Sequence, residues 1–490
     1  MKEKNKENLL IFELQTILIL KLLRSILPFL LLLLSFAGTA QTVQNDASPS
    51  DSPIIFNVVI ENEDGSWGHG YIKSNGEVIA EPQFYSAWEF KNGMARVKIM
   101  DKTSYYTSYI DTNGVLLKQK FGWLSHEFTP DGLCMVRDYE TEKWGFINKK
   151  GEYVIKPRFD EVEDFSEGLA RVKVDGKYGY VDYDGKMVVK PQFDIAEDFS
   201  EGLALVIIDT DEWHRKIYYI DKAGNYVSET QFWARFCHGL ARVMVDGKYG
   251  FIDKTENMVL EPQFDFAPIY VNGFFIVRNN KYYGLVDTTG KIIFEPQSFV
   301  EPIFHEGYAL ISTSECYNPY NFYAPPIPCN YGFIDKTGKI VIKPQFGKAY
   351  DFCNGFSNVY NRRYELHGFI NKKGELVIPY QFKEAKDFSE NGLAAVRLDD
   401  KWGYIDTTGK FVIEPKFQYA GSFRNGMARV ETNDKKWGYI DMTGKYLQLY
   451  NDYVGEFQNG FATFHKNEKV GIIDTTGKII IEPKYDEIFW

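Results

Sequence analysis

The strongest constraint on the fold is a repeat, because one short pattern recurs along the whole chain of 490 residues. Residues 401–417 read KWGYIDTTGKFVIEPKF, and near copies begin at Lys177 (KYGYVDYDGKMVVKPQF) and Asn330 (NYGFIDKTGKIVIKPQF). Aligning the chain on itself gives twelve copies of this motif. A chain that repeats one unit at a near-constant spacing folds as stacked copies of that unit, so the repeat comes before any count of domains.

Nearly every copy carries an Asp-x-x-Gly turn signal. The Asp accepts hydrogen bonds from backbone amides two residues on, and the Gly takes the left-handed conformation that ends a type I turn with a bulge. We therefore expect Asp406, Gly409, Asp441 and Gly444 to be structural turn residues and assign them no catalytic role. The turn glycines are Gly76, Gly114, Gly151, Gly185, Gly224, Gly290, Gly338, Gly374, Gly409, Gly444 and Gly477, and Glu256 stands at the sixth position.

Each repeat predicts three short strands. In LARVKV, Ala170 and Val172 share one face and Arg171 and Lys173 the other, which indicates a strand with one solvated side. KYGYVD and KMVVKP follow as two more strands joined by the Asp-to-Gly turn, and a proline ends the third strand because it cannot donate to a ladder. Each unit thus runs from GLARV to EPQF.

Three strands of this length cannot bury an apolar face alone, so the units must stack. Aromatic residues make up 16% of the chain and recur at fixed repeat positions, which suits a thin core. We expect an all-β fold of about twelve three-stranded β repeats in an open solenoid-like array. The alternative is closed β-propeller-like rings, for example two rings of six units, but a propeller blade normally has four strands.

The N-terminus reads as an export signal. Residues 1–40 combine basic residues, an apolar stretch and a small-residue site ending at Ala40, which predicts a cleaved signal peptide and a periplasmic, cell-surface or secreted protein. An uncleaved anchor is the alternative, although Lys21 and Arg24 leave an apolar run that is short for a bilayer span. Residues 41–53 read as a flexible linker, and 54–490 as the repeat array.

The charge argues against nucleic acid as a partner. Removing five basic and three acidic residues with the signal peptide moves the formal net charge from −11 to about −13. So acidic a chain repels phosphate backbones. We therefore expect no nucleic-acid partner and, after signal cleavage, no stable membrane span.

Five cysteines are few for an exported chain of this size. Cys316 and Cys329 flank an insertion at residues 312–330 that most repeats lack, and we expect them to form a disulfide that closes this loop. The loop is a candidate binding surface because it concentrates aromatic side chains, with a covering of the sheet edge as the alternative. Its aromatic residues are Tyr317, Tyr320, Phe322 and Tyr323. The other cysteines read as small buried hydrophobes: Cys134, Cys237 and Cys353.

The motif residues resemble a known group, the bacterial WG repeat proteins, whose units carry a WG or YG dipeptide ahead of YIDTTGKxVIxPxF. The resemblance spans residues 54–490. It implies an all-β repeat architecture, and it supplies no set of catalytic residues. This chain departs from the pattern at Glu256 and where the strand-ending proline is missing, around Phe121, Phe232 and Leu449, so we expect local irregularity there.

The sequence contains no motif that names a reaction. Histidines are scattered, no CxxC or HExxH occurs, and the acidic turns lack the ligand order of a calcium loop, so we expect no catalytic, cofactor-binding or metal site. The leading hypothesis is a non-enzymatic exported scaffold that binds a protein or glycan at the cell envelope. The alternatives are a carbohydrate- or peptidoglycan-active enzyme, with its site near Trp213 and His214 or in the insertion, and a purely structural surface spacer.

Overall fold

The computed structural model describes residues 53–101, 104–122, 126–209, 215–230, 232, 234–313, 330–450 and 452–490. These residues form antiparallel strands and contain no helix, so none of them lies in a helix that could cross a bilayer. The expectation of an all-β fold is confirmed. The expected signal peptide, nearly all of the linker and the cysteine-flanked loop lie outside the described residues.

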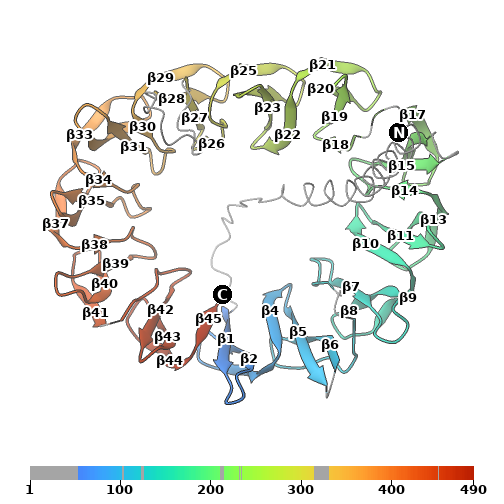
Figure 1. Cartoon of the computed structure of the whole chain (residues 1–490), viewed down its shortest axis with the longest axis horizontal. Helices are drawn as coiled ribbons and strands as arrows, with labels where there is room; N and C mark the ends of the chain where they lie inside the picture. The colour runs from blue at the N-terminus through green and yellow to red at the C-terminus, as the bar shows by residue number, and fades with distance from the viewer. Residues whose placement is uncertain are drawn as a thin grey trace, which may run out of the picture. The chain divides into compact units, whose positions relative to one another are not determined.

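The described strands form twelve sheets, which we call blades 1 to 12 in chain order and which surround a common centre (Figure 1). The innermost strands are β45 (Glu487–Phe489), β4 (Ser86–Lys91), β10 (Glu161–Ser166), β14 (Ile195–Ala196), β18 (Phe236–Cys237), β22 (Phe266–Val271), β26 (Phe304–His305), β30 (Lys348–Ala349), β34 (Glu384–Ala385) and β38 (Tyr419–Ala420). The second strands are β1 (Ile55–Glu61), β5 (Met94–Asp101), β7 (Leu133–Arg137), β11 (Leu169–Val174), β15 (Leu203–Asp209), β19 (Leu240–Val245), β23 (Phe274–Asn279), β27 (Tyr308–Ser312), β31 (Phe356–Asn361), β35 (Ala394–Leu398), β39 (Met427–Glu431) and β42 (Phe461–Lys466).

The third strands are β2 (Trp67–Lys73), β6 (Ser104–Asp111), β8 (Trp144–Asn148), β12 (Lys177–Val181), β16 (Arg215–Asp221), β20 (Lys248–Asp253), β24 (Tyr282–Asp287), β28 (Tyr331–Asp335), β32 (Leu366–Asn371), β36 (Lys401–Ile405), β40 (Trp437–Asp441) and β43 (Lys469–Asp474). The outer strands are β3 (Val78–Phe84), β9 (Tyr153–Phe159), β13 (Met187–Phe193), β17 (Tyr226–Thr230), β21 (Met258–Phe264), β25 (Ile292–Ser298), β29 (Ile340–Phe346), β33 (Leu376–Phe382), β37 (Phe411–Phe417), β41 (Tyr446–Tyr450) and β44 (Ile479–Tyr485).

Most blades therefore have four strands, not the three expected from the repeat. The additional strand is the innermost one, and it is as short as two residues in β14 and β30, too short for a period-two pattern to reveal. Blades 3 and 12 have only a local pairing in its place. His126 donates its backbone N–H to Met135 in blade 3, and Val454 bridges to Phe464 in blade 12.

The ring is closed, which selects the propeller-like alternative over the open array. Strand β45, at the end of the chain, pairs antiparallel with β1 and becomes the innermost strand of blade 1 (Figure 1). The junction is held by Asp486, whose carboxylate accepts from Lys469 Nζ at 2.6 Å and from the Glu61 backbone N–H at 2.8 Å. The twelve described blades thus belong to one ring and not to two rings of six.

The same contact joins neighbouring blades inside the chain. Between blades 4 and 5, Asp194 accepts from Lys177 Nζ at 2.5 Å and from the Asp209 N–H at 2.9 Å. Asp160 and Asp265 repeat the arrangement at two other junctions. The closing junction is therefore built like the continuous ones, and the ring has no weaker seam in this respect.

The glycine of the WG or YG dipeptide lets the outer strand approach the third strand closely. A Cβ added to Gly403 would lie 2.6 Å from the Ile413 carbonyl oxygen and 2.8 Å from the Pro415 nitrogen. The outer strand bulges there, because three residues, 414–416, oppose Gly403 alone. Gly403 and Pro415, which lie in the adjacent strands β36 and β37, thus belong to one kink. Only a residue without a side chain fits beneath the kinked strand.

Blades 2 and 5 lack both parts of this kink. Ser108 and Tyr218 occupy the position of the glycine, and the proline is missing as well. In blade 5 the outer strand β17 consequently pairs in regular register from Ile217 to Tyr219, with Tyr218 opposite Glu229. The irregularity expected at Glu256 does not occur in the backbone: this residue adopts φ +62° and its N–H bonds to Asp253 O at 2.9 Å, as the glycines do.

The core lies between blades, so both faces of a blade are covered. Phe159, Phe193 and Phe417, the aromatic residues after the proline, are fully buried. In β11 the face expected to be solvated is largely covered at Arg171, which is only 16% exposed and contacts the next blade, whereas Arg242 and Met244 at the matching positions of β19 are exposed. Stacking on both sides explains why an arginine at an alternate position is not a surface residue.

Candidate binding sites on the ring

The Asp-x-x-Gly residues form turns in the structure. Asp406 Oδ1 accepts from the Thr408 N–H at 2.9 Å, the Thr408 hydroxyl at 2.6 Å and the Lys410 N–H at 3.1 Å. These bonds, led by the Thr408 hydroxyl, lower the pKa of Asp406. Gly409 follows at φ +86°, and Asp441 and Gly444 repeat the geometry. Oδ1 of the carboxylate is thus engaged three times by its own turn.

Two side chains of a blade hold the innermost strand of the next one. Tyr180 Oη donates to the Glu197 carbonyl at 2.6 Å, and Arg171 donates to the preceding carbonyl, that of Ala196. An asparagine replaces the arginine in some blades, as in Asn358, which donates to Ala385 O at 2.6 Å. The remaining tyrosines of this kind are Tyr71, Tyr109, Tyr219, Tyr404 and Tyr439. These repeated residues satisfy buried carbonyls and build the ring.

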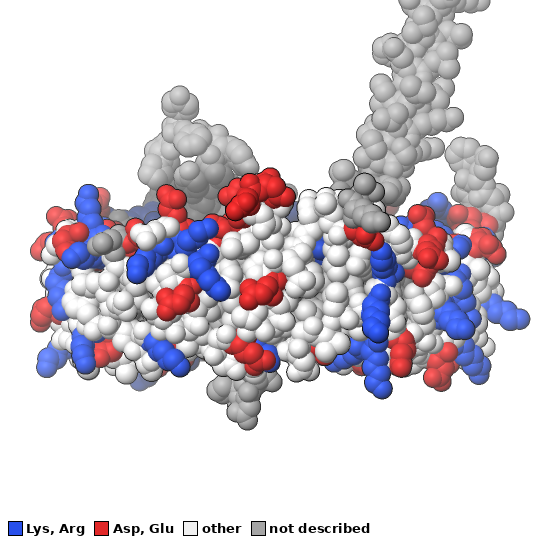
Figure 2. All heavy atoms as spheres, turned by 90° about the horizontal axis from the view of Figure 1, so that it is seen from below, with Lys and Arg blue, Asp and Glu red and all other residues white. Residues whose placement is uncertain are grey.

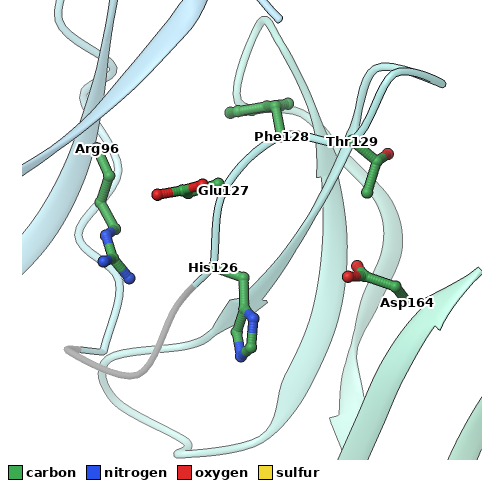
Figure 3. A pocket seen from close by; sticks show the side chains of 6 residues that line it. All are labelled: Arg96, His126, Glu127, Phe128, Thr129 and Asp164. Carbon is green, nitrogen blue, oxygen red and sulfur yellow. The ribbon is translucent and has the colours of Figure 1, made fainter. Parts of the chain in front are cut away.

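A first pocket, the blade 2–4 pocket, has a volume of about 370 Å³ and is lined by Arg96, His126, Glu127, Phe128, Thr129 and Asp164. Figure 3 shows Glu127 extending toward the side of Arg96, with His126 below it and Asp164 on the side opposite Arg96. Burial lowers the pKa of His126 and raises that of Asp164. Glu127 is already paired with Lys91 at 2.7 Å. The groups that this pocket leaves for a ligand are therefore the neutral imidazole of His126 and the partly buried carboxyl group of Asp164.

Carboxylates gather at two places, on an innermost strand or within two residues of its end. Glu163, Asp164 and Asp198 lie together at blades 4 and 5, and Asp351 and Asp387 at blades 9 and 10. Burial raises the pKa of Glu163, Asp164, Asp351 and Asp387, and the neighbouring carboxylate adds to the shift of Asp387. Among the described residues, no group of His, Cys, Asp and Glu has the arrangement of a metal site.

A second pocket, the blade 9–11 pocket, has a volume of about 430 Å³. Its walls come from three consecutive blades around β30, β34 and β38, on the left side of the ring in Figure 1. Aromatic and cationic side chains dominate it. The lining residues are Tyr350, His367, Glu384, Ala385, Lys386, Arg397, Trp402, Gln418 and Tyr419.

Lys386 lies among the aromatic rings of this pocket. Its Nζ is 4.4 Å from the Tyr419 ring centre and 5.5 Å from that of Trp402, and it donates to Tyr419 Oη at 3.0 Å. Although burial opposes the change, hydrogen bonds from Lys386 and Arg429 lower the pKa of Tyr419. Arg397, the other cation of the pocket, is paired with Glu384.

On the side of the ring that Figure 2 shows, charged side chains of one sign do not gather in one place. There, acidic and basic side chains are interspersed. The pockets therefore stand out by the mixture of groups in each of them and not by a broad surface charge.

The structure describes three of the five cysteines, and none of these is in a disulfide. Cys134 is buried in β7, where burial raises the pKa of its thiol to about 12. Cys237 and Cys353 are half-buried, so the prediction of buried hydrophobes fits Cys134 best. The expected bridge Cys316–Cys329, the aromatic loop with Tyr317, Tyr320, Phe322 and Tyr323, and the region of Trp213 and His214 lie outside the described residues and stay predictions.

Sequence reasoning missed both pockets. Their residues occupy repeat positions that differ from copy to copy: Lys386 stands where other blades have Glu197 or Gly421, directly after the small residue that ends the innermost strand, here the half-buried Ala385. The positions that differ between repeats could have pointed to the pockets, but a comparison of the positions that the repeats share does not consider them. The aspartates that join neighbouring blades, such as Asp194 and Asp486, could have been found from their shared place directly after the aromatic residue that ends the outer strand.

The model of the "WG containing repeat" family matches more than half of the chain. The matched segments are residues 70–102, 144–178, 178–209, 249–283, 283–313, 331–361, 368–402, 402–435 and 471–489. No curated protein sequence matches the chain.

Solved structures share only a distant likeness. A eukaryotic initiation factor aligns at 11% identity and a TM-score of 0.33, over 82% of this chain and 97% of that one. The tricorn protease aligns at 10% identity and a TM-score of 0.21, over 89% of this chain and 63% of that one. BamB from Moraxella catarrhalis aligns at 9% identity and a TM-score of 0.20, over 65% of this chain and 94% of that one. Scores this low define no common fold, so the architecture rests on the strand pairing above.

Proposed function

The chain belongs to the family of proteins built from the WG containing repeat, and from this membership and the geometry of its ring we propose that it is a non-enzymatic binding scaffold for a protein or glycan at the cell envelope. One observation carries the proposal: the repeated residues are engaged in the architecture. Asp406 caps its turn, Gly403 accommodates the kinked strand, and Tyr404 bonds the next blade. Recognition then falls to the residues that vary between blades, in the two pockets and on the innermost strands.

The envelope location rests on the export signal read from residues 1–40. Fractionation of cells that express the full-length chain, followed by N-terminal sequencing, tests it. Recovery outside the cytoplasm with cleavage after Ala40 is the expected result, and a cytoplasmic protein with an intact N-terminus contradicts the location.

Binding is tested with the exported full-length chain on a glycan array and in pull-downs from envelope extracts. Specific capture of a glycan or protein supports the scaffold, and no capture in either assay favours the structural spacer. Release of reducing ends from cell-wall polymers by the same preparation favours an enzyme and contradicts the proposal. Deletion of residues 317–328 tests whether the aromatic loop is the binding surface. Lost capture assigns binding to the loop, and unchanged capture excludes it.

A further inference from the structure

The blade 9–11 pocket contains one positive charge that the fold does not neutralise. Lys386 bonds to the hydroxyl of Tyr419 and, in the part of the chain that the structure describes, forms no ion pair with Asp or Glu. Arg397 and Glu384 balance each other beside it. A pocket cation that lies beside two aromatic rings and, among the described residues, has no carboxylate partner favours an anionic ligand at this place.

The pocket also presents fixed hydrogen-bond acceptors. Asn358 Nδ2 donates to the Ala385 carbonyl at 2.6 Å, so its Oδ1 faces His367 Nδ1 at 2.9 Å and accepts the proton there. His367 is thereby held as the Nδ1–H tautomer, with Nε2 left as an acceptor. Burial, reinforced by Lys348, lowers the pKa of His367 to about 4, which keeps the ring neutral near pH 7.

A carboxylate on its own needs only donors, whereas hydroxyl groups need donors and acceptors together. The pocket offers both, because the Gln418 amide can donate or accept, Glu384 accepts, and Lys386 donates. Tyr350, which lines the pocket, is 43% exposed and so offers accessible aromatic surface. The volume of about 430 Å³ lies within the range of small-molecule sites, roughly 300–1,000 Å³.

We propose that the blade 9–11 pocket binds an acidic saccharide, a sugar ring that carries one carboxylate. The carboxylate pairs with Lys386, the hydroxyls bond to Gln418 and His367, and the apolar face of the sugar lies against Tyr350. The mixture of donors and acceptors favours a polyhydroxylated ring, whose hydroxyls both donate and accept, over the carboxylate side chains of an acidic peptide, which only accept. This inference rests on the proposed scaffold function and names the ligand class of one site.

The test is titration calorimetry on the exported full-length chain with trigalacturonate, its neutral galactose counterpart and a hexaglutamate peptide. We expect trigalacturonate to bind at least tenfold more tightly than either comparison ligand. Lys386→Gln should weaken this binding roughly ten- to a hundredfold, because a charge-assisted bond to the ligand is lost. Lys416→Gln is the matched control: Lys416 also lies over two rings, those of Phe417 and Tyr446, but outside the pocket, and its loss should leave the affinity unchanged.

A second pair of variants separates stacking from charge. Tyr350→Ala should weaken trigalacturonate severalfold, and Tyr364→Ala, which removes an exposed tyrosine of the same blade outside the pocket, should not. The proposal is overturned if no variant of the pocket alters trigalacturonate binding, if hexaglutamate binds as tightly, or if no trigalacturonate binds at millimolar concentration. In each of these cases, capture of another glycan or protein on the array would leave the scaffold function standing and would remove only this site.

Discussion

The backbone N–H of Glu61 donates a 2.8 Å hydrogen bond to the carboxylate of Asp486, which lies 425 residues later in the chain. Because Asp486 also binds Lys469, one side chain joins blade 12 to blade 1. Neighbouring blades elsewhere are joined in the same way without any break in the chain, as Asp194 shows. The last strand therefore completes an ordinary blade junction, and the stability of the ring depends on it.

Removal of residues 487–490 should open this junction. The deletion takes away Ile488, 7% exposed, and the contact of Trp490 with Phe56, whose ring centres are 5.2 Å apart. We expect the free energy of unfolding to fall by roughly 3–5 kcal/mol, as for the loss of a large buried side chain. Thermal and denaturant unfolding measure it, with Phe489→Ala, at an exposed position, as a control that should change little. An unchanged melting temperature after the deletion contradicts closure by β45.

Gly403→Ala tests the origin of the WG dipeptide. The new Cβ would lie 2.6 Å from Ile413 O, so the outer strand must move, and we expect a loss of roughly 1–3 kcal/mol. Gly68→Ala is the graded control, since its Cβ would meet Pro82 O at 3.3 Å, and it should cost less. Equal losses for both variants, measured by denaturant unfolding, would argue against close approach as the reason for the glycine.

These elements differ in how far the sequence predicts them. The turn at Asp406 and Gly409 depends on residues within five positions, so its chemistry is visible in the sequence alone. The requirement for Gly403 depends on a kink centred on Pro415, in another strand, and is visible only once the strands are paired. Lys386 could not be assigned to a pocket, because Trp402 approaches it only within the folded blade 10 and Tyr419 only when blade 11 is stacked on blade 10. Closure was undecided for a similar reason: one ring, two rings and an open array all contain the same repeat.

Glu256→Gly should stabilise the protein. Glu256 has φ +62° in a turn where other blades have glycine, and its Oε1 is buried without a hydrogen-bond partner. The left-handed conformation costs a non-glycine residue about 1–2 kcal/mol, and the greater freedom of glycine in the unfolded chain offsets part of the gain. We expect a net increase of roughly 0.5–1 kcal/mol in denaturant unfolding. The reciprocal variant Gly409→Glu should destabilise blade 10, and a gain there would contradict this account of the turn.

Tyr404→Phe should weaken the contact between blades 10 and 11. Tyr404 is fully buried and donates to the Gly421 carbonyl at 2.8 Å, so the variant leaves that carbonyl without its partner. A loss of about 1–2 kcal/mol is expected in denaturant unfolding. The space itself accepts phenylalanine, because Phe369 occupies the same place in blade 9 and is fully buried. An unaltered stability would mean that the hydroxyl does not contribute to the stacking of blades.

The stability of the fold should depend on pH through His367. Burial, with a further contribution from Lys348, lowers its pKa from 6.5 to about 4, so the unfolded chain takes up the proton more readily than the folded one. Its contribution is fully present above about pH 6.5 and is lost as the pH falls toward 4. Because the side chain is partly exposed, the loss should not exceed about 2 kcal/mol. His367→Gln removes the titration but keeps a group that can bond to Asn358, so the stability difference between wild type and variant should shrink or reverse on acidification. If the free energies of unfolding of wild type and variant change in parallel between pH 7 and 4.5, His367 titrates alike in the folded and unfolded states. A neutral His367 with a fixed tautomer in the blade 9–11 pocket would then lose its support as well.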